Sequence, residues 1–197
     1  MKLSVFSIVT VGLTVGTLAA PANIERDLPT ITGVLSGIGT KVDALDSAIQ
    51  AYTGGDVNKV QQASDSLVDA INAGTTKVSG TSNLSGGDAL GLPGPVNDLK
   101  QKITTTVTHL SGKKSQIVQA GKGGQTYNDL IQQKTAAKKL SDTIVSKVPD
   151  NLQNVASGVA GGISDAIEKG VNDFQDQAAK GGKREVTSSD AVAAIAV

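Results

Sequence analysis

The chain has 197 residues, 39% of them hydrophobic but only 2% aromatic, and its 18 basic side chains balance 18 acidic ones. This length fits one domain by the usual range of roughly 100–200 residues, and the core must be built from aliphatic side chains. With one histidine and no cysteine, disulfides and metal sites made from His and Cys are excluded, and without a basic face we predict neither a nucleic-acid partner nor a cofactor.

Residues 1–22 have the pattern of a secretory signal peptide. A charged start at Lys2 precedes an apolar stretch softened by Ser, Thr and Gly, and small residues offer cleavage sites near Ala20 or Ala22. The alternative, a membrane anchor or a buried helix, is disfavoured because the stretch is short for a span of ~20 apolar residues. We therefore predict cleavage, secretion out of the cell and a mature protein without a transmembrane anchor.

Residues 24–52 predict a long amphipathic helix. Apolar residues recur at alternating intervals of four and three from Ile24 to Tyr52. This spacing places them along one seam, which is stable in water only if other helices cover it. The rest of the chain must supply those helices.

A second helix is predicted over 57–79, with Asp56 placed to cap it. Its seam has the same rhythm, interrupted by Ser64 and Gly74. The Gly- and Pro-rich residues 80–95 then predict a long surface connection.

This connection contains Asn83-Leu84-Ser85, an acceptor sequence for N-glycosylation. Such a triplet also occurs by chance. Secretion and a loop setting favour its use, so Asn83 is the candidate glycosylation site.

A third helix is predicted over 96–120 and ends at a glycine-rich turn over 121–124. Thr126 and Asp129 resemble a capping box and predict the start of a fourth helix, which runs to the boundary at Pro149.

The last predicted helix, over 150–179, contains Gly158, Gly161, Gly162 and Gly170. An interior glycine costs roughly 1 kcal/mol relative to alanine, so this helix should be the least stable by itself. The glycines either permit the close approach of a neighbour or ligand or are a feature of the surface.

Five such seams predict an all-α fold: a single bundle of about five amphipathic helices over 23–180, favoured over an intermolecular coiled coil. Residues 181–197 are predicted to be a disordered tail. Lys183-Arg184 in this tail is either a processing site of the secretory pathway or a pair of solvated charges.

Nothing in the chain favours catalysis. A Ser-His-Asp set could use only His109, whose place beside the seam indicates a helix-surface histidine. The glycine-rich residues 121–126 lack the spacing of a phosphate loop and follow a helix rather than a strand. We therefore predict that the protein is not an enzyme.

Several short motifs, in their joint order and spacing, resemble a known family, the fungal hydrophobic surface binding protein A group, which merges with the cell-wall galactomannoproteins. They are Arg26-Asp27-Leu28, Leu45-Asp46-Ser47-Ala48-Ile49-Gln50-Ala51-Tyr52, Gly54-Gly55-Asp56 and Ser146-Lys147-Val148-Pro149. The resemblance covers about 24–179.

The resemblance implies a secreted, non-catalytic five-helix bundle, extracellular or in the cell wall. Members of this group adsorb to hydrophobic surfaces and recruit polyester-degrading hydrolases, and related galactomannoproteins hold fatty acids inside the bundle. The leading hypothesis is therefore binding to hydrophobic surfaces or lipids, with recruitment of secreted hydrolases. The alternatives are a carrier that encloses a fatty acid and a structural cell-wall mannoprotein.

No local motif transfers the family's ligand contacts to this chain. Ser64, Thr106 and Gln133 are polar residues at seam positions and are the candidates to bind a lipid head group. Alternatively, they are interior polar residues whose hydrogen bonds are satisfied within the bundle.

Overall fold

The structure is a computed structural model that describes residues 27–180. Five long helices form its body: α1 (Asp27–Ala51), α2 (Asn58–Ser79), α4 (Pro93–Gly112), α6 (Gly123–Val145) and α7 (Asp150–Phe174). Two short helices, α3 (Gly86–Ala89) and α5 (Lys114–Gln119), and a 3-10 helix, η1 (Gln175–Lys180), complete it. The described residues contain no strand, which confirms the predicted all-α fold.

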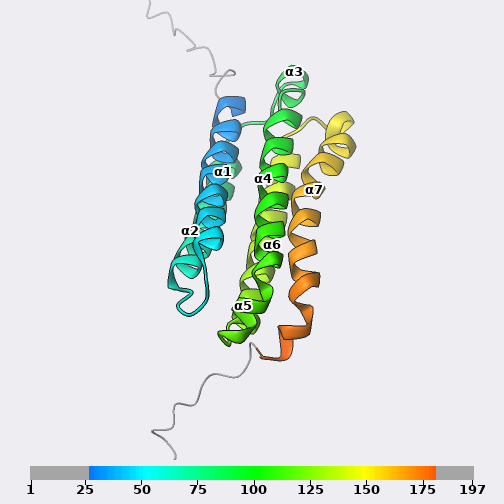
Figure 1. Cartoon of the computed structure of the whole chain (residues 1–197). Coiled ribbons are helices and arrows are strands. Elements are labelled where there is room, and N and C mark those ends of the chain that lie inside the picture. Colours follow the sequence, from blue (N-terminus) through cyan, green and yellow to red (C-terminus); the bar gives the residue numbers. More distant parts are fainter. Residues whose placement is uncertain (1–26, 181–197) are drawn as a thin grey trace, which may run out of the picture.

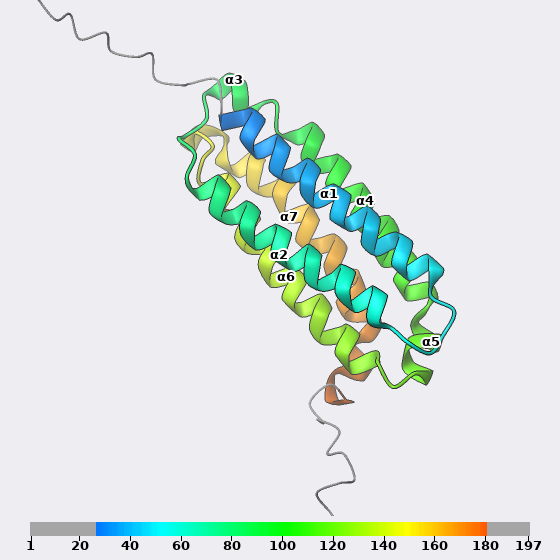
Figure 2. The ribbon, with the colours of Figure 1, turned by 90° about the vertical axis from the view of Figure 1, so that its left-hand side faces the viewer.

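The five long helices form a closed ring. Contacts join α1 to α2, α2 to α6, α6 to α7, α7 to α4 and α4 back to α1. Figures 1 and 2 show these helices side by side along one direction, with α3 at one end of the bundle and α5 at the other. Each seam therefore faces a common axis, which every long helix helps to enclose.

The predicted seams form the core. The first helix buries Ile31, Leu35, Ile38, Val42, Leu45 and Ile49, and Tyr52 just after it is also buried. These residues follow the predicted four-and-three rhythm. Gly74, which interrupts the seam of α2, permits close packing because a Cβ there would lie 2.6 Å from Val34 Cγ1 on α1. Within the described residues, the large hydrophobic side chains left exposed are Leu90 and Val155.

The first turn between helices agrees with the sequence. Gly54 and Gly55 have φ values of 113° and 83°, which favour glycine and end α1. Asp56 Oδ1 accepts a hydrogen bond from the Asn58 backbone N–H at 2.8 Å, so this carboxylate does satisfy an N–H at the start of α2, although it precedes the capping position.

Three predicted boundaries were wrong. The third predicted helix starts at Pro93, a residue suited to a first helical turn, and it breaks at Lys113 into α4 and α5. The 80–95 connection contains α3, whose first turn is capped by Ser85. The last helix changes to the 3-10 conformation after Phe174.

The capping box was also wrong. Helix α6 begins at Gly123, and the Thr126 hydroxyl donates to the Lys122 carbonyl at 3.0 Å inside the first turn. Gly121 makes the preceding bend with φ of 73°. The turn needs a glycine only at position 121, so Gly123 and Gly124 can form the first residues of α6.

The predicted signal peptide over 1–22 and the tail over 181–197 with Lys183-Arg184 lie outside the described residues. In the part of the chain that is described, no helix has the length and apolarity that crossing a membrane requires.

Candidate functional site: cavities along the bundle axis

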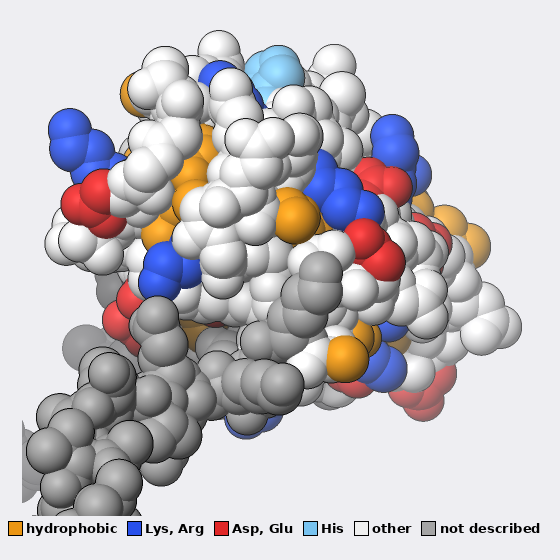
Figure 3. Space-filling model, turned by 60° about the horizontal axis from the view of Figure 1, so that its bottom comes forward, with side chains coloured by type: hydrophobic (Ala, Val, Ile, Leu, Met, Phe, Trp, Pro, Cys, Tyr) orange, Lys and Arg blue, Asp and Glu red, His pale blue; other side chains and the backbone are white. Residues whose placement is uncertain are grey.

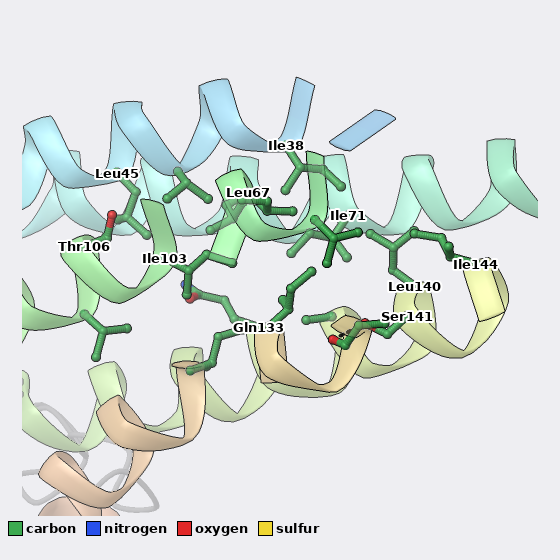
Figure 4. Close-up of a pocket in the computed structure, with 18 residues that line it drawn as sticks. Ile38, Leu45, Leu67, Ile71, Ile103, Thr106, Gln133, Leu140, Ser141 and Ile144 are labelled. Atoms are coloured by element: carbon green, nitrogen blue, oxygen red, sulfur yellow. Dashed lines mark hydrogen bonds between the residues drawn. The ribbon is translucent and has the colours of Figure 1, made fainter. Parts of the chain in front are cut away.

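An apolar cavity, the central cavity, lies on the axis of the ring and is lined by all five long helices. Figure 4 shows the aliphatic side chains that point into it. Its polar lining residues are Thr106, Gln133 and Ser141, and the Ser141 hydroxyl donates to the Ala160 carbonyl at 3.3 Å. The cavity leaves about 40 Å³ for the centres of water molecules, about three times the ~10–15 Å³ that one water needs.

A second cavity, the polar cavity, adjoins the first toward the α5 end. The two share Leu45, Thr106, Val107 and Gln133 as walls, so they lie next to each other along the axis. The further polar lining residues of this cavity are Gln61, Ser64, Lys122, Gln125, Thr126 and Asp129. Figure 3 looks toward this end of the molecule, where hydrophobic side chains show between polar ones and charges of both signs are interspersed.

A third cavity, the α3-end cavity, adjoins the central cavity on the opposite side. It shares Val96, Ile144 and Ala160 with the central cavity, and its other walls come from α3 and the residues after it, the start of α4, the connection after α6 and the first half of α7. Leu90 and Val155 stand at its edge. The interior therefore has a polar end at α5 and an apolar end at α3.

The stretch of α6 that lines the central cavity is about as long as an acyl chain. Gln133 and Ile144 both line the central cavity and lie eleven residues apart on α6, which is about 16 Å along a helix. One acyl chain fills about half of the ~30 Å hydrocarbon core of a bilayer, or roughly 15 Å.

The structure brings all three predicted head-group residues to the polar cavity. Ser64, Thr106 and Gln133 are 4%, 6% and 7% exposed, and each lines this cavity. Gln133 Nε2 donates to Ser64 Oγ at 2.9 Å across α6 and α2. The Thr106 hydroxyl instead donates to the Lys102 carbonyl in its own helix, at 2.9 Å. Ser64 and Gln133 thus form a buried polar pair, whereas Thr106 is satisfied locally.

The Ser64–Gln133 pair can still bind a ligand. A hydroxyl that accepts one hydrogen bond retains its own hydrogen, and an amide NH₂ carries two donors. A carboxyl or hydroxyl group in the polar cavity could therefore accept hydrogen bonds from this pair.

The sequence reasoning missed the other polar residues of this cavity. Burial raises the pKa of Asp129 to about 6, opposed by a hydrogen bond from Gln61 and reinforced by the charge of Asp65. Gln125 Nε2 donates to Gln61 Oε1 at 2.6 Å. Helical spacing could have identified two of these residues, because Gln61 lies three residues before Ser64 and Asp129 lies four before Gln133.

The other candidates lie apart from the cavities. His109 Nδ1 is 2.7 Å from Asp46 Oδ1, so the histidine joins α4 to α1 at the edge of their contact, and neither residue lines the central or polar cavity. Asn83 is exposed in the connection between α2 and α3. Among the described residues, no group of three or more His, Cys, Asp or Glu side chains is placed to hold a metal ion.

A closed ring of amphipathic helices around an apolar interior with one polar end defines a class of helical bundle suited to hydrophobic ligands. Comparison with known proteins identifies the family. Residues 28–146 match the family described as Hydrophobic surface binding protein A, and the chain belongs to this family. The predicted family resemblance is therefore confirmed.

Two relatives are named cell wall mannoprotein 1. The one from Aspergillus flavus is 44% identical over 170 residues, which cover 86% of this chain and 62% of the relative. The one from Aspergillus fumigatus is 41% identical over 175 residues, which cover 89% of this chain and 61% of the relative. The chain thus spans about three fifths of the length of these relatives.

A solved structure has the same fold. Ligand binding domain 2 of the Penicillium marneffei MP1 protein is 35% identical, with a TM-score of 0.72, and the match covers 76% of this chain and 97% of that domain. That domain is complexed with multiple arachidonic acids.

Proposed function

We propose that this protein is a non-catalytic carrier of fatty acids, with the acyl chain in the central cavity and the carboxyl group in the polar cavity. The observation that carries this proposal is that an apolar cavity and a buried cavity with polar walls adjoin on the bundle axis and share Gln133 as a wall. The arachidonic acids bound by the similar MP1 domain support it.

Within this proposal, Ser64 and Gln133 bind the head group through their remaining donors, with Lys122 as the nearby cation of the cavity wall. Thr106 borders the junction of the two cavities, where its methyl group adds apolar surface while its hydroxyl stays bonded to Lys102.

Titration of delipidated protein with arachidonic acid tests this function. We expect saturable binding and a rise in the unfolding temperature, because a ligand that binds only the folded state stabilises it. The double variant Ser64→Ala with Gln133→Leu should bind the acid about tenfold more weakly, since a lost hydrogen bond to a charged group costs ~1.5–3 kcal/mol. Calorimetry and thermal unfolding give both readouts.

The matched control for this titration is the variant Ser115→Ala with Gln119→Leu on α5, whose side chains line neither cavity. It should bind like the parent protein. A delipidated protein that is indifferent to arachidonic acid and to shorter and longer fatty acids would rule the carrier function out.

Adsorption to hydrophobic surfaces is a second candidate function, favoured by the exposed Leu90 and Val155 at the edge of the α3-end cavity. These side chains are 72% and 65% exposed. We expect Leu90→Ser with Val155→Ser to reduce adsorption to polyester particles by about tenfold or more, because burying one such side chain contributes ~1.5–3 kcal/mol. Depletion of protein from solution measures this.

Unchanged adsorption of that double variant would exclude this end of the bundle as the contact surface. Recruitment of secreted polyester hydrolases belongs to the same candidate function, and co-sedimentation of a hydrolase with protein-coated particles tests it. The titration with arachidonic acid serves as the control for folding of the variant.

We further propose that the protein is secreted to the extracellular space or the cell wall and is glycosylated at Asn83. The relatives named cell wall mannoprotein and the exposure of Asn83 support this. Intact mass before and after enzymatic deglycosylation tests the modification, and an unchanged mass would refute it.

A further inference from the structure

Asp129 occupies a position at the polar cavity that a carrier of carboxylates would not be expected to fill with an acid. It lies one helical turn before Gln133 on α6, and both side chains line the same cavity. Lys122 and Asp129 are the charged residues of that lining. Lys122 is exposed at the turn before α6, whereas Asp129 is partly buried, so the acid is the charge nearer the interior.

We propose that Asp129 makes the binding of an anionic lipid depend on acidity, by donating a hydrogen bond to the head group when protonated and repelling it when ionised. This inference rests on the proposed carrier function. Two carboxylates that share a partly buried site cannot both ionise without a large cost, so the complex with an anion requires the neutral acid.

The surroundings of Asp129 decide the range in which it exchanges its proton. From α2, Asp65 opposes ionisation and Gln61 favours it through a hydrogen bond, while burial has the largest effect and raises the pKa to about 6. From the turn before α6, Lys122 lines the cavity. Helices α1, α4 and α5 contribute only uncharged side chains to its wall. Proton uptake therefore falls in the mildly acidic range.

The size and sign of the effect follow from linkage. If protonation of Asp129 raises the affinity for the anion, binding of the anion must raise the affinity of Asp129 for its proton by the same factor. With a pKa of about 6 in the free protein, affinity for an anion should fall up to tenfold for each pH unit above that value. Between about pH 5 and about pH 7.5 the limit is roughly 30-fold.

Hexadecanesulfonate is the probe that isolates this effect, because its head group stays anionic throughout that pH range. Hexadecanol is the neutral counterpart with the same tail. We expect parent protein to bind the sulfonate roughly 10- to 30-fold more weakly at about pH 7.5 than at about pH 5, and to bind hexadecanol equally at both. Asp129→Asn should bind the sulfonate equally at both pH values, within about twofold.

The matched control is Asp142→Asn, which removes an exposed carboxylate on the same helix that pairs with Lys138 at 2.8 Å, away from the polar cavity. It should retain the full pH dependence. Equal pH profiles for parent protein and Asp129→Asn would overturn the inference while leaving the carrier function intact if hexadecanol still binds. Failure of both probes to bind at either pH would overturn the inference and the carrier function together.

Discussion

Replacing Ala137 with phenylalanine should abolish or weaken fatty-acid binding by at least about tenfold while leaving the bundle folded. Ala137 is 4% exposed on α6 and lines the central cavity between Gln133 and Leu140. The larger side chain would take up the space that we assign to the acyl chain. Excluding even two methylene groups of that chain costs about 1.6 kcal/mol, or more than tenfold in affinity. Calorimetric titration with arachidonic acid measures the loss.

The neighbouring Ala136 provides a matched control, because it is also buried on α6 but lines neither the central nor the polar cavity. Overpacking costs ~1–3 kcal/mol at either position, so Ala136→Phe reports the effect of strain alone. It should retain binding. Helix content and the unfolding midpoint of both variants verify that they fold, and normal binding by a folded Ala137→Phe would place the acyl chain elsewhere.

The sequence was sufficient to predict most of the fold because the seams are long and regular. The apolar rhythm of α1 identifies its buried face from Ile31 to Ile49, and the glycines at 54 and 55 mark its end. The order of helices around the ring could not be obtained in this way. A seam shows that a helix must be covered, but it does not show which of the other helices covers it.

Local patterns misled where glycines had a tertiary role. The run at 121–124 predicts a stop, yet Gly123 is helical and a Cβ there would lie 2.9 Å from Gln177 Cγ in η1. This glycine therefore serves the contact between the start of α6 and the chain after α7. Similarly, a Cβ at Gly170 would lie 3.2 Å from Leu130 Cδ2, whereas Gly158 and Gly161 face open space. Gly170 thus permits the close approach of neighbouring helices, whereas Gly158 and Gly161 are features of the surface.

The candidate site was only partly predictable for the same reason. Ser64 and Gln133 could be selected because each is polar within an apolar seam, but their contact joins residues 69 positions apart and depends on the ring. Asp129 was assigned to a capping box by its spacing from Thr126. Its position at the polar cavity follows from its place on the same face of α6 as Gln133, one turn away.

Replacing Phe174 with alanine should produce the largest loss of stability in the described part of the bundle, about 3–5 kcal/mol in the free energy of unfolding. Phe174 is fully buried, ends α7 and is the largest fully buried side chain. It also holds Lys114 at this end: the Lys114 Nζ lies 5.7 Å from the ring centroid and donates to the Asp173 carbonyl at 2.5 Å. The cavity left by the ring would therefore loosen the contact of α7 with α5 as well as the core.

Urea unfolding followed by circular dichroism measures this loss, which is a large part of the ~5–15 kcal/mol that stabilises a typical domain. Val155→Ala is the matched control on the same helix, because Val155 is 65% exposed and its truncation should change stability by no more than about 0.5 kcal/mol. A midpoint for Phe174→Ala equal to that of the control would mean that α7 is not anchored at its C-terminal end. In that case the ring would owe its closure to the contacts of α7 nearer the central cavity, at Ile163 and Ile167, and ligand binding would then be expected to stabilise α7 more than any other helix.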